Sequence, residues 1–296
     1  MKGGARYSVS FGESLAAGNF GRGHYDDLAI GWSKRIDGYA NSGAVSVLYG
    51  SPSGLTGAQS QLWTQVSPGL RGRPGIAFDF GAGLAGGNFG RGHLDDLAIS
   101  AAGETVGGKR YAGALYVLYG SASGLTATHA QRWTQSSPFV AGTPMKEGWF
   151  AAALVAANLG RGPQDDLAVG ESFATVGRYR RAGEFHVFFG TPTGLRAKGG
   201  QLWTLNTPGV HGRARAKRGF GDVGCAAHFG RGRWADLVET EDDQPPHNSY
   251  GPGAVQVLYG SPRGLTGVGV QRWREGEHGI PGTRTAYDLF GHVACG

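Results

Sequence analysis

Pairs of aspartates in a Gly-rich setting are the residues of this sequence with the clearest chemical capacity. The first pair, Asp26-Asp27, stands in GNFGRGHYDDLAIG, residues 18–31, which combines a turn, two carboxylates and a short apolar run. Adjacent carboxylates can bind a divalent cation or act as general acid and base. The pair returns at 95–96 and 165–166, while the fourth copy reads Ala235-Asp236. Because the pair recurs together with a longer repeat, we expect its role to be structural.

Catalytic machinery is not indicated elsewhere in the chain. Nine histidines are scattered, and none of them pairs a nucleophile with a base at a recognisable spacing. Glycine supplies 56 of the 296 residues, so a Gly-rich loop is no evidence for a phosphate site here. We therefore expect a non-catalytic protein without a cofactor.

The elements that must position the aspartates belong to a long internal repeat. A phenylalanine returns at intervals of 69, 70, 70 and 70 residues, and a tryptophan closes each unit. The units are residues 11–79, 80–149, 150–219 and 220–289, and residues 290–296 begin a fifth. The landmarks are Phe11, Phe80, Phe150, Phe220 and Phe290, with Trp63, Trp133, Trp203 and Trp273. We treat 1–296 as a single domain.

Each unit is predicted to form four short strands. In the first unit these are FGESLAAG, DLAIG, GAVSVLYG and QLWTQ, separated by Gly-, Ser- and Pro-rich turns. Only 17% of residues are charged and 40% are hydrophobic, which favours an all-β protein with a packed core. Four strands per unit, repeated in phase, are typical of the blade of a β-propeller.

The repeat resembles the FG-GAP repeat, the blade of the integrin α-chain amino-terminal β-propeller. The resemblance rests on the FG pair, the small-residue strand, the Gly-rich loop and the Asp-Leu-Ala-Ile/Val-Gly run, and GSPSGLTGAQSQLWTQ is similar to actinobacterial versions. It implies a propeller that acts in binding or adhesion, outside the cell or at its surface. Propellers of this family usually have seven blades, roughly 490 residues at this period. We therefore expect a fragment of a larger propeller; a closed four-bladed ring and a ring completed between chains remain alternatives.

The same resemblance implies calcium binding by the loop between the first two strands, but its ligands are mostly lost. Two of the four side-chain ligand positions are glycine in every copy, and one carboxylate per loop is too little for tight calcium binding. The remaining positions are Asn19 and Asp27, Asn88 and Asp96, Asn158 and Asp166, and His228 and Asp236. We expect no metal there. An arginine stands in each loop (Arg22, Arg91, Arg161 and Arg231), and our hypothesis is that it and the glycine amides bind the aspartates instead; the alternative is that it points into solvent.

A ligand is expected on the face formed by the loops between strands two and three and between units. The third unit carries a cluster of seven cations and one tyrosine in two such loops: Arg178, Tyr179, Arg180, Arg181, Arg213, Arg215, Lys217 and Arg218. This basic cluster suits an anionic glycan or an acidic protein segment. Carboxylates of the fourth unit are an internal alternative partner: Glu239, Glu241, Asp242 and Asp243. A face that is merely solvated is the third alternative.

Composition narrows the function further. The net charge is +6 and the pI about 9.4, which indicates either anionic partners or solubility alone. No apolar run of 18 residues occurs and the first ten residues lack an apolar signal core, so we expect no membrane insertion and no signal peptide in this chain. Cys225 and Cys295 occupy equivalent points of successive units, and we expect them to be free, because a bridge needs Cα atoms within about 7 Å.

We thus predict a non-catalytic binding or adhesion module whose ligand is a protein or an anionic carbohydrate. Nucleic acid is not expected as a partner. An accessory propeller of a larger secreted enzyme and a purely structural scaffold are the alternatives.

Overall fold

The computed structural model describes residues 10–230, 232–241, 253–283 and 290–291. These residues contain sixteen β-strands and no helix. The strands are β1 Phe11–Gly18, β2 Asp27–Trp32, β3 Ala44–Tyr49, β4 Thr56–Trp63, β5 Leu84–Gly87, β6 Asp96–Ala101, β7 Ala114–Tyr119, β8 Thr126–Trp133, β9 Ala153–Ala157, β10 Asp166–Glu171, β11 Glu184–Phe189, β12 Arg196–Trp203, β13 Asp222–Ala227, β14 Asp236–Glu241, β15 Ala254–Ser261 and β16 Gly264–Trp273.

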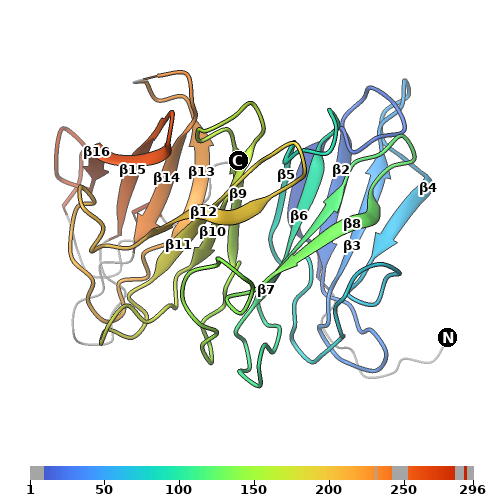
Figure 1. Ribbon diagram of the computed structural model, residues 1–296, viewed down its shortest axis with the longest axis horizontal. Coiled ribbons are helices and arrows are strands. Elements are labelled where there is room, and N and C mark those ends of the chain that lie inside the picture. The colour runs from blue at the N-terminus through green and yellow to red at the C-terminus, as the bar shows by residue number, and fades with distance from the viewer. Residues whose placement is uncertain (1–9, 231, 242–252, 284–289, 292–296) are drawn as a thin grey trace.

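The strands form four separate antiparallel sheets, each made of four consecutive strands. The order is β1-β2-β3-β4, β5-β6-β7-β8, β9-β10-β11-β12 and β13-β14-β15-β16. The all-β prediction and the prediction of four strands per unit are confirmed. The sheets follow one another side by side across the molecule (Figure 1). Such up-and-down sheets are blade-like, and short hydrogen-bonded turns such as Ser51–Gly54 join their outer strands.

The core lies between neighbouring sheets. Three buried clusters fill the spaces between the first and second, second and third, and third and fourth sheets. The first strands of successive sheets contact one another, β1 with β5, β5 with β9 and β9 with β13. Small residues make this approach possible, because a Cβ added to Gly86 of β5 would lie 2.5 Å from the carbonyl oxygen of Ala17 in β1.

The FG pair was predicted to begin the first strand of each unit, but in three of the four units it precedes that strand. It begins β1 in the first unit, but β5, β9 and β13 begin after it. The reason is that this phenylalanine pairs with the preceding sheet: the Phe80 amide donates to the carbonyl of Ser42, and Gly43 bridges to Phe80. Phe11 has no preceding sheet in the described part of the chain and stays in line with β1.

The start of the fifth unit is partly visible. A Cβ added to Gly253 would lie 2.1 Å from the carbonyl oxygen of Phe290, as one added to Gly43 would lie 2.3 Å from that of Phe80. The backbone of Phe290 therefore lies against the fourth sheet as that of Phe80 lies against the first, and Phe290 is half-buried. Residues 292–296 lie outside the described residues.

The expectation of a free thiol at Cys225 is wrong, because this residue of β13 is disulfide-bonded. The sequence has one other cysteine, Cys295, which lies outside the described residues.

No helix with the length and apolarity needed to cross a bilayer occurs in the described ranges.

Candidate functional site

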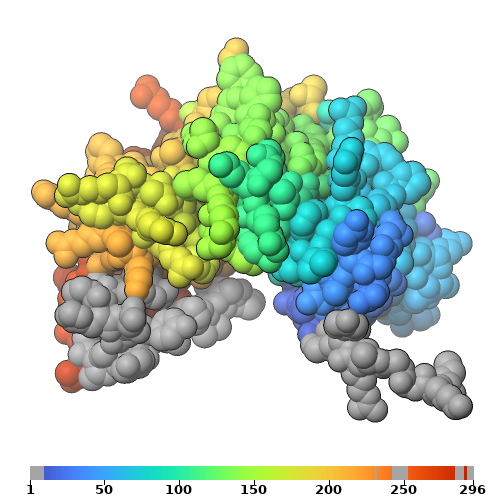
Figure 2. All heavy atoms as spheres, turned by 90° about the horizontal axis from the view of Figure 1, so that it is seen from below, coloured from blue at the N-terminus to red at the C-terminus, as the bar shows by residue number. Residues whose placement is uncertain are grey.

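The two loops that carry the predicted basic cluster lie side by side. Residues 172–183 join β10 to β11, and residues 204–221 join β12 to β13. The amide of Lys217 donates to the carbonyl of Arg180 (2.9 Å), and the amide of Gly219 donates to that of Arg181 (3.2 Å). Figure 2 looks onto this side of the molecule, where the yellow and orange segments adjoin. The prediction that the loops share a face is confirmed.

Most cations of the cluster are exposed. Exposed members are Arg178, Arg180, Arg181, Arg213, Arg215 and Lys217, and Tyr179 is half-buried among them. Two are held by aromatic rings: the guanidinium of Arg178 lies 5.1 Å from the ring centre of Tyr179 and donates to its hydroxyl, and that of Arg181 lies 5.1 Å from the ring centre of Phe173. Such cation–π contacts orient the charged groups without neutralising them.

Arg218 departs from the rest of the cluster. It is only 8% exposed, and its Nη2 donates to Oε2 of Glu241 at 2.8 Å. Internal pairing with the fourth sheet therefore neutralises this one member. Glu239, also proposed as a neutralising group, is buried and accepts the amide of Gly221 instead. Asp242 and Asp243 lie outside the described residues.

The aspartates predicted as remnants of a metal loop bind backbone amides. In the third sheet, Asp166 accepts the amide of Leu159 on Oδ2 (3.0 Å) and that of Gly190 on Oδ1 (2.9 Å). Asp27, Asp96 and Asp236 each make the same two bonds in their own sheets. Burial raises the pKa of Asp96 and of Asp166 to about 7, although the amides act in the opposite direction. Each carboxylate thus uses one oxygen to hold the loop between the first two strands of its sheet, and the other to hold the turn that follows the third strand.

The amide positions of the loop have local roles of the same kind. The side-chain Oδ1 of Asn19 accepts the Gly21 amide, and Asn88 and Gly90 repeat the contact. The side-chain amide of Asn158 donates to the carbonyl of Gly162 (2.9 Å). These bonds close the turn around the glycines of the loop.

The hypothesis that the loop arginines bind the aspartates is wrong for Arg22, Arg91 and Arg161. Arg161 lies over the ring of Phe189 (4.0 Å) and donates from Nε to the carbonyl of Arg263 in the next sheet (2.9 Å). Arg22 makes the equivalent contacts, over the Tyr49 ring (4.4 Å) and to the carbonyl of Ser123 (2.8 Å). Arg91 lies over Tyr119 (4.9 Å). These arginines join neighbouring sheets, and Arg231 lies outside the described residues.

Replacing Arg161 by alanine is therefore expected to lower the free energy of unfolding by about 1–2 kcal/mol, because two hydrogen bonds to backbone carbonyls and one aromatic contact are lost. Lysine should restore less than half, since it lacks the planar fork. Guanidinium denaturation followed by tryptophan fluorescence measures the change. The control is Arg178→Ala, an exposed arginine whose contact among the described residues is with Tyr179 of its own loop. An equal effect of the two substitutions would contradict the joining role.

The first aspartate of each pair also connects sheets. Oδ2 of Asp95 accepts the amide of Asn19 in the preceding sheet (2.8 Å), and Asp165 accepts that of Asn88 (2.9 Å). Asp26 has no such neighbour and is exposed. In each of these two pairs, the second aspartate closes its own loop, and the first holds the equivalent loop of the preceding sheet.

A buried polar cluster in the third sheet was not found by sequence reasoning. Glu171 ends β10, Glu184 begins β11, and His186 follows on the same face; they are 0%, 7% and 3% exposed. His186 Nε2 lies 3.5 Å from Oε1 of Glu184 and 3.9 Å from Oε2 of Glu171. The side-chain amide of Gln135 donates to both glutamates, at 2.7 Å and 3.4 Å. The three groups could together hold a cation.

The electrostatics of this Glu171–Glu184–His186 cluster are unusual. Burial, followed by the charge of Glu184, raises the pKa of Glu171 to about 7, and His186 acts against them. Burial lowers the pKa of His186, but the two glutamates outweigh it and the net direction is upward. Oε1 of Glu171 and Nε2 of His186 make no hydrogen bond.

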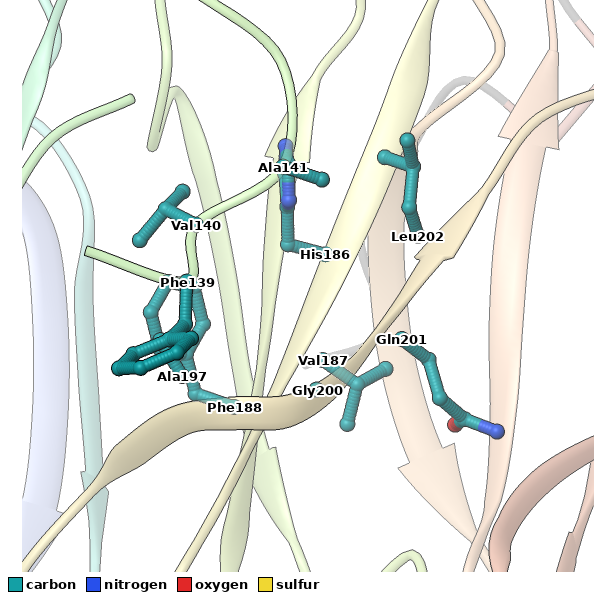
Figure 3. A pocket seen from close by; sticks show the side chains of 10 residues that line it. All are labelled: Phe139, Val140, Ala141, His186, Val187, Phe188, Ala197, Gly200, Gln201 and Leu202. Carbon is teal, nitrogen blue, oxygen red and sulfur yellow. The ribbon is translucent and has the colours of Figure 1, made fainter. Parts of the chain in front are cut away.

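A pocket opens beside this cluster. It has a volume of about 100 Å³ and is lined by His186, Phe188 and Leu202, with Phe139 and Val140 from the loop before β9. Figure 3 shows the His186 ring directed toward the part of that loop that carries Ala141. Phe139 is 68% and Leu202 38% exposed, so the pocket reaches solvent.

Comparison of the units could have indicated this cluster. Glu184 pairs with Glu171 across the sheet, and the three equivalent pairs are Trp32 with Ala44, Ala101 with Ala114, and Glu241 with Ala254. A glutamate facing a glutamate where the other units have alanine is a departure from the repeat. The signal is the residue that does not recur, whereas the repeat is defined by the residues that do.

No protein-family model matches the chain, and no curated protein matches it either.

Proposed function

We propose that this chain is part of an FG-GAP-type β-propeller and acts as a non-catalytic binding module with an anionic ligand. The fold part of the proposal is supported by four consecutive four-stranded sheets whose first strands adjoin in order, as the inner strands of propeller blades do. The unfilled packing positions at the two outermost sheets support a larger ring.

These positions are seen by comparing equivalent residues. Leu125, Leu195 and Leu265 are 2–3% exposed because each inserts into the preceding sheet, whereas Leu55 of the first sheet is 50% exposed. At the other end, Phe20 and Phe89 are fully buried by the following sheet, whereas Phe229 is 52% exposed. Each end therefore presents one half of the contact that joins neighbouring sheets. A blade of the same kind fits both halves.

The ligand is proposed from the charge of the loop face. Five guanidinium groups and one ammonium group are exposed on two hydrogen-bonded loops, and this is the single observation that carries the proposal. Glu241 pairs with Arg218, the buried member of the cluster, whereas the five exposed guanidinium groups favour an external polyanion such as a sulfated or uronic glycan, or an acidic protein segment.

Retention on immobilised heparin tests this proposal. The chain should elute at a salt concentration that falls by about a third or more in the double variant Arg180→Ala with Arg215→Ala, because exposed charge pairs are screened by salt. The matched control is Arg71→Ala with Arg73→Ala, which removes the same charge from the equivalent loop after the first sheet. Equal loss in both variants would show that net charge alone is responsible and would contradict a specific site.

We also propose an extracellular or cell-surface location, because one cysteine of the chain is oxidised. Disulfides persist in oxidising compartments, and Cys225 is disulfide-bonded.

A further inference from the structure

The fourth sheet also has a buried glutamate at the end of its second strand, and there the glutamate has two arginine partners that the third sheet lacks. In the fourth sheet, Glu241 is the counterpart of Glu171, and it is held by Arg218 (2.8 Å) and by Arg272. The residues at the corresponding places around Glu171 are Gly148 and Leu202, each 70 positions earlier in the chain. Both protein cations are therefore missing from the third sheet.

The third sheet at the same time carries more negative charge. Glu184 adds a second buried carboxylate where the other sheets have alanine. Two buried carboxyl groups beside a single imidazole are costly to ionise, because removing charges from water carries a penalty of several kcal/mol per ion. The loop after β8 nevertheless covers them closely: a Cβ at Gly148 would lie 2.6 Å from Oε1 of Glu171, and one at Gly142 3.5 Å from Oε1 of Glu184.

We propose that Glu171, Glu184 and His186 bind one divalent transition-metal cation of the zinc type, which replaces the two arginines found in the fourth sheet. Tetrahedral zinc with bonds of about 2.0–2.1 Å places its ligand atoms about 3.3 Å apart. The ligand atoms of the three residues all lie within 4.8 Å of one another, and the two distances from His186 Nε2 are 3.5 and 3.9 Å. Side-chain movements below about 1 Å would complete the site.

Unpartnered atoms point to the same ligand. Nε2 of His186 and Oε1 of Glu171 are buried without a hydrogen bond, and so is Oε1 of Gln135. Turning the amide of Gln135 over would exchange its oxygen with the nitrogen that now contacts both glutamates, and would supply a fourth ligand. An imidazole with carboxylate and amide oxygens suits zinc or manganese, whereas calcium needs six to eight oxygens. The pocket beside His186 is the entry path.

The repeat itself provides the test variants. Leu202→Arg introduces the cation that Arg272 supplies in the fourth sheet, and Glu184→Ala restores the alanine of the other three sheets. Both residues are natural at the equivalent positions, so folding is expected to survive. His93→Gln, which removes an exposed histidine far from the cluster, is the matched control for adventitious binding.

The experiment is a zinc titration of the chelator-treated full chain, followed by calorimetry and by thermal unfolding. We expect one zinc ion per chain in the wild type and in His93→Gln, with a rise in Tm of about 5 °C at 100 times the dissociation constant. Glu184→Ala should weaken binding by about 100-fold or more, and Leu202→Arg should lose the zinc response while keeping or raising the Tm without metal. Calcium should have no effect on the wild type.

Three results would overturn the proposal. The first is a wild-type chain that binds no zinc at micromolar concentrations. The second is zinc binding of equal affinity in Glu184→Ala and Leu202→Arg, because the ion would then lie elsewhere. The third is an equal response to calcium. Circular dichroism of each variant establishes that it is folded when the titration is made.

Discussion

Replacing Asp166 by alanine is expected to lower the free energy of unfolding by about 2–6 kcal/mol, one of the largest effects of any single substitution in this chain. The amides of Leu159 and Gly190 would lose their acceptor, the first in a fully buried place and the second in a half-buried one. Each buried amide left without a partner costs about 1–3 kcal/mol. Guanidinium denaturation of the wild type and the variant at pH 5 measures the difference.

The control is Asp26→Ala, which removes a carboxylate of the same motif at an exposed position and should change stability by less than about 0.5 kcal/mol. The pH dependence has a definite sign. The pKa of Asp166 is about 7 in the folded chain against an ordinary value of 3.8, so its contribution is complete below about pH 4 and declines as the pH rises through 7. The loss in Asp166→Ala should therefore be larger at pH 5 than at pH 8. The reverse order would contradict the assignment.

Replacing Phe80 by alanine is expected to lower the free energy of unfolding by about 3–5 kcal/mol, the cost of removing a large buried ring. Phe80 is 1% exposed between the first and second sheets, and its ring meets that of Tyr116 edge-on at 5.4 Å. The equivalent substitution in the first unit, Phe11→Ala, should change stability by less than about 0.5 kcal/mol, because Phe11 is 63% exposed.

This pair of variants also measures whether the first sheet is open in solution. The two phenylalanines occupy the same position of the repeat, but only Phe80 has a preceding sheet to pack on in the described part of the chain. Denaturation curves of the two variants under the same conditions give the comparison. A loss in Phe11→Ala close to that in Phe80→Ala would mean that the edge of β1 is covered, and would contradict the open edge on which the proposed larger ring rests.

Sequence alone was sufficient for the elements and their grouping. The period of the phenylalanines and tryptophans predicted four units, and the alternation of apolar runs with Gly- and Pro-rich turns predicted four strands in each, because these signals are local and repeat in phase. The two basic loops were also placed on one face by strand parity alone, since loops at the same end of an antiparallel sheet must lie together. Whether that face binds a polyanion stays a prediction.

Only the tertiary structure decided the partners of the charged groups. Arg161 and Asp166 belong to the same loop motif, yet the guanidinium of Arg161 bonds to Arg263 in another sheet, about a hundred residues away. The reason is that the arginine is exposed, whereas the aspartate is buried and accepts amides of its own sheet. Arg218 likewise lies in the basic cluster by its place in the sequence, but its guanidinium pairs with Glu241 of the fourth sheet. The Glu171–Glu184–His186 cluster appears when two strands pair in register and a loop from the preceding unit closes over them. Sequence spacing determines the strands of this protein, whereas the packing of one sheet on the next determines which of its charges are satisfied.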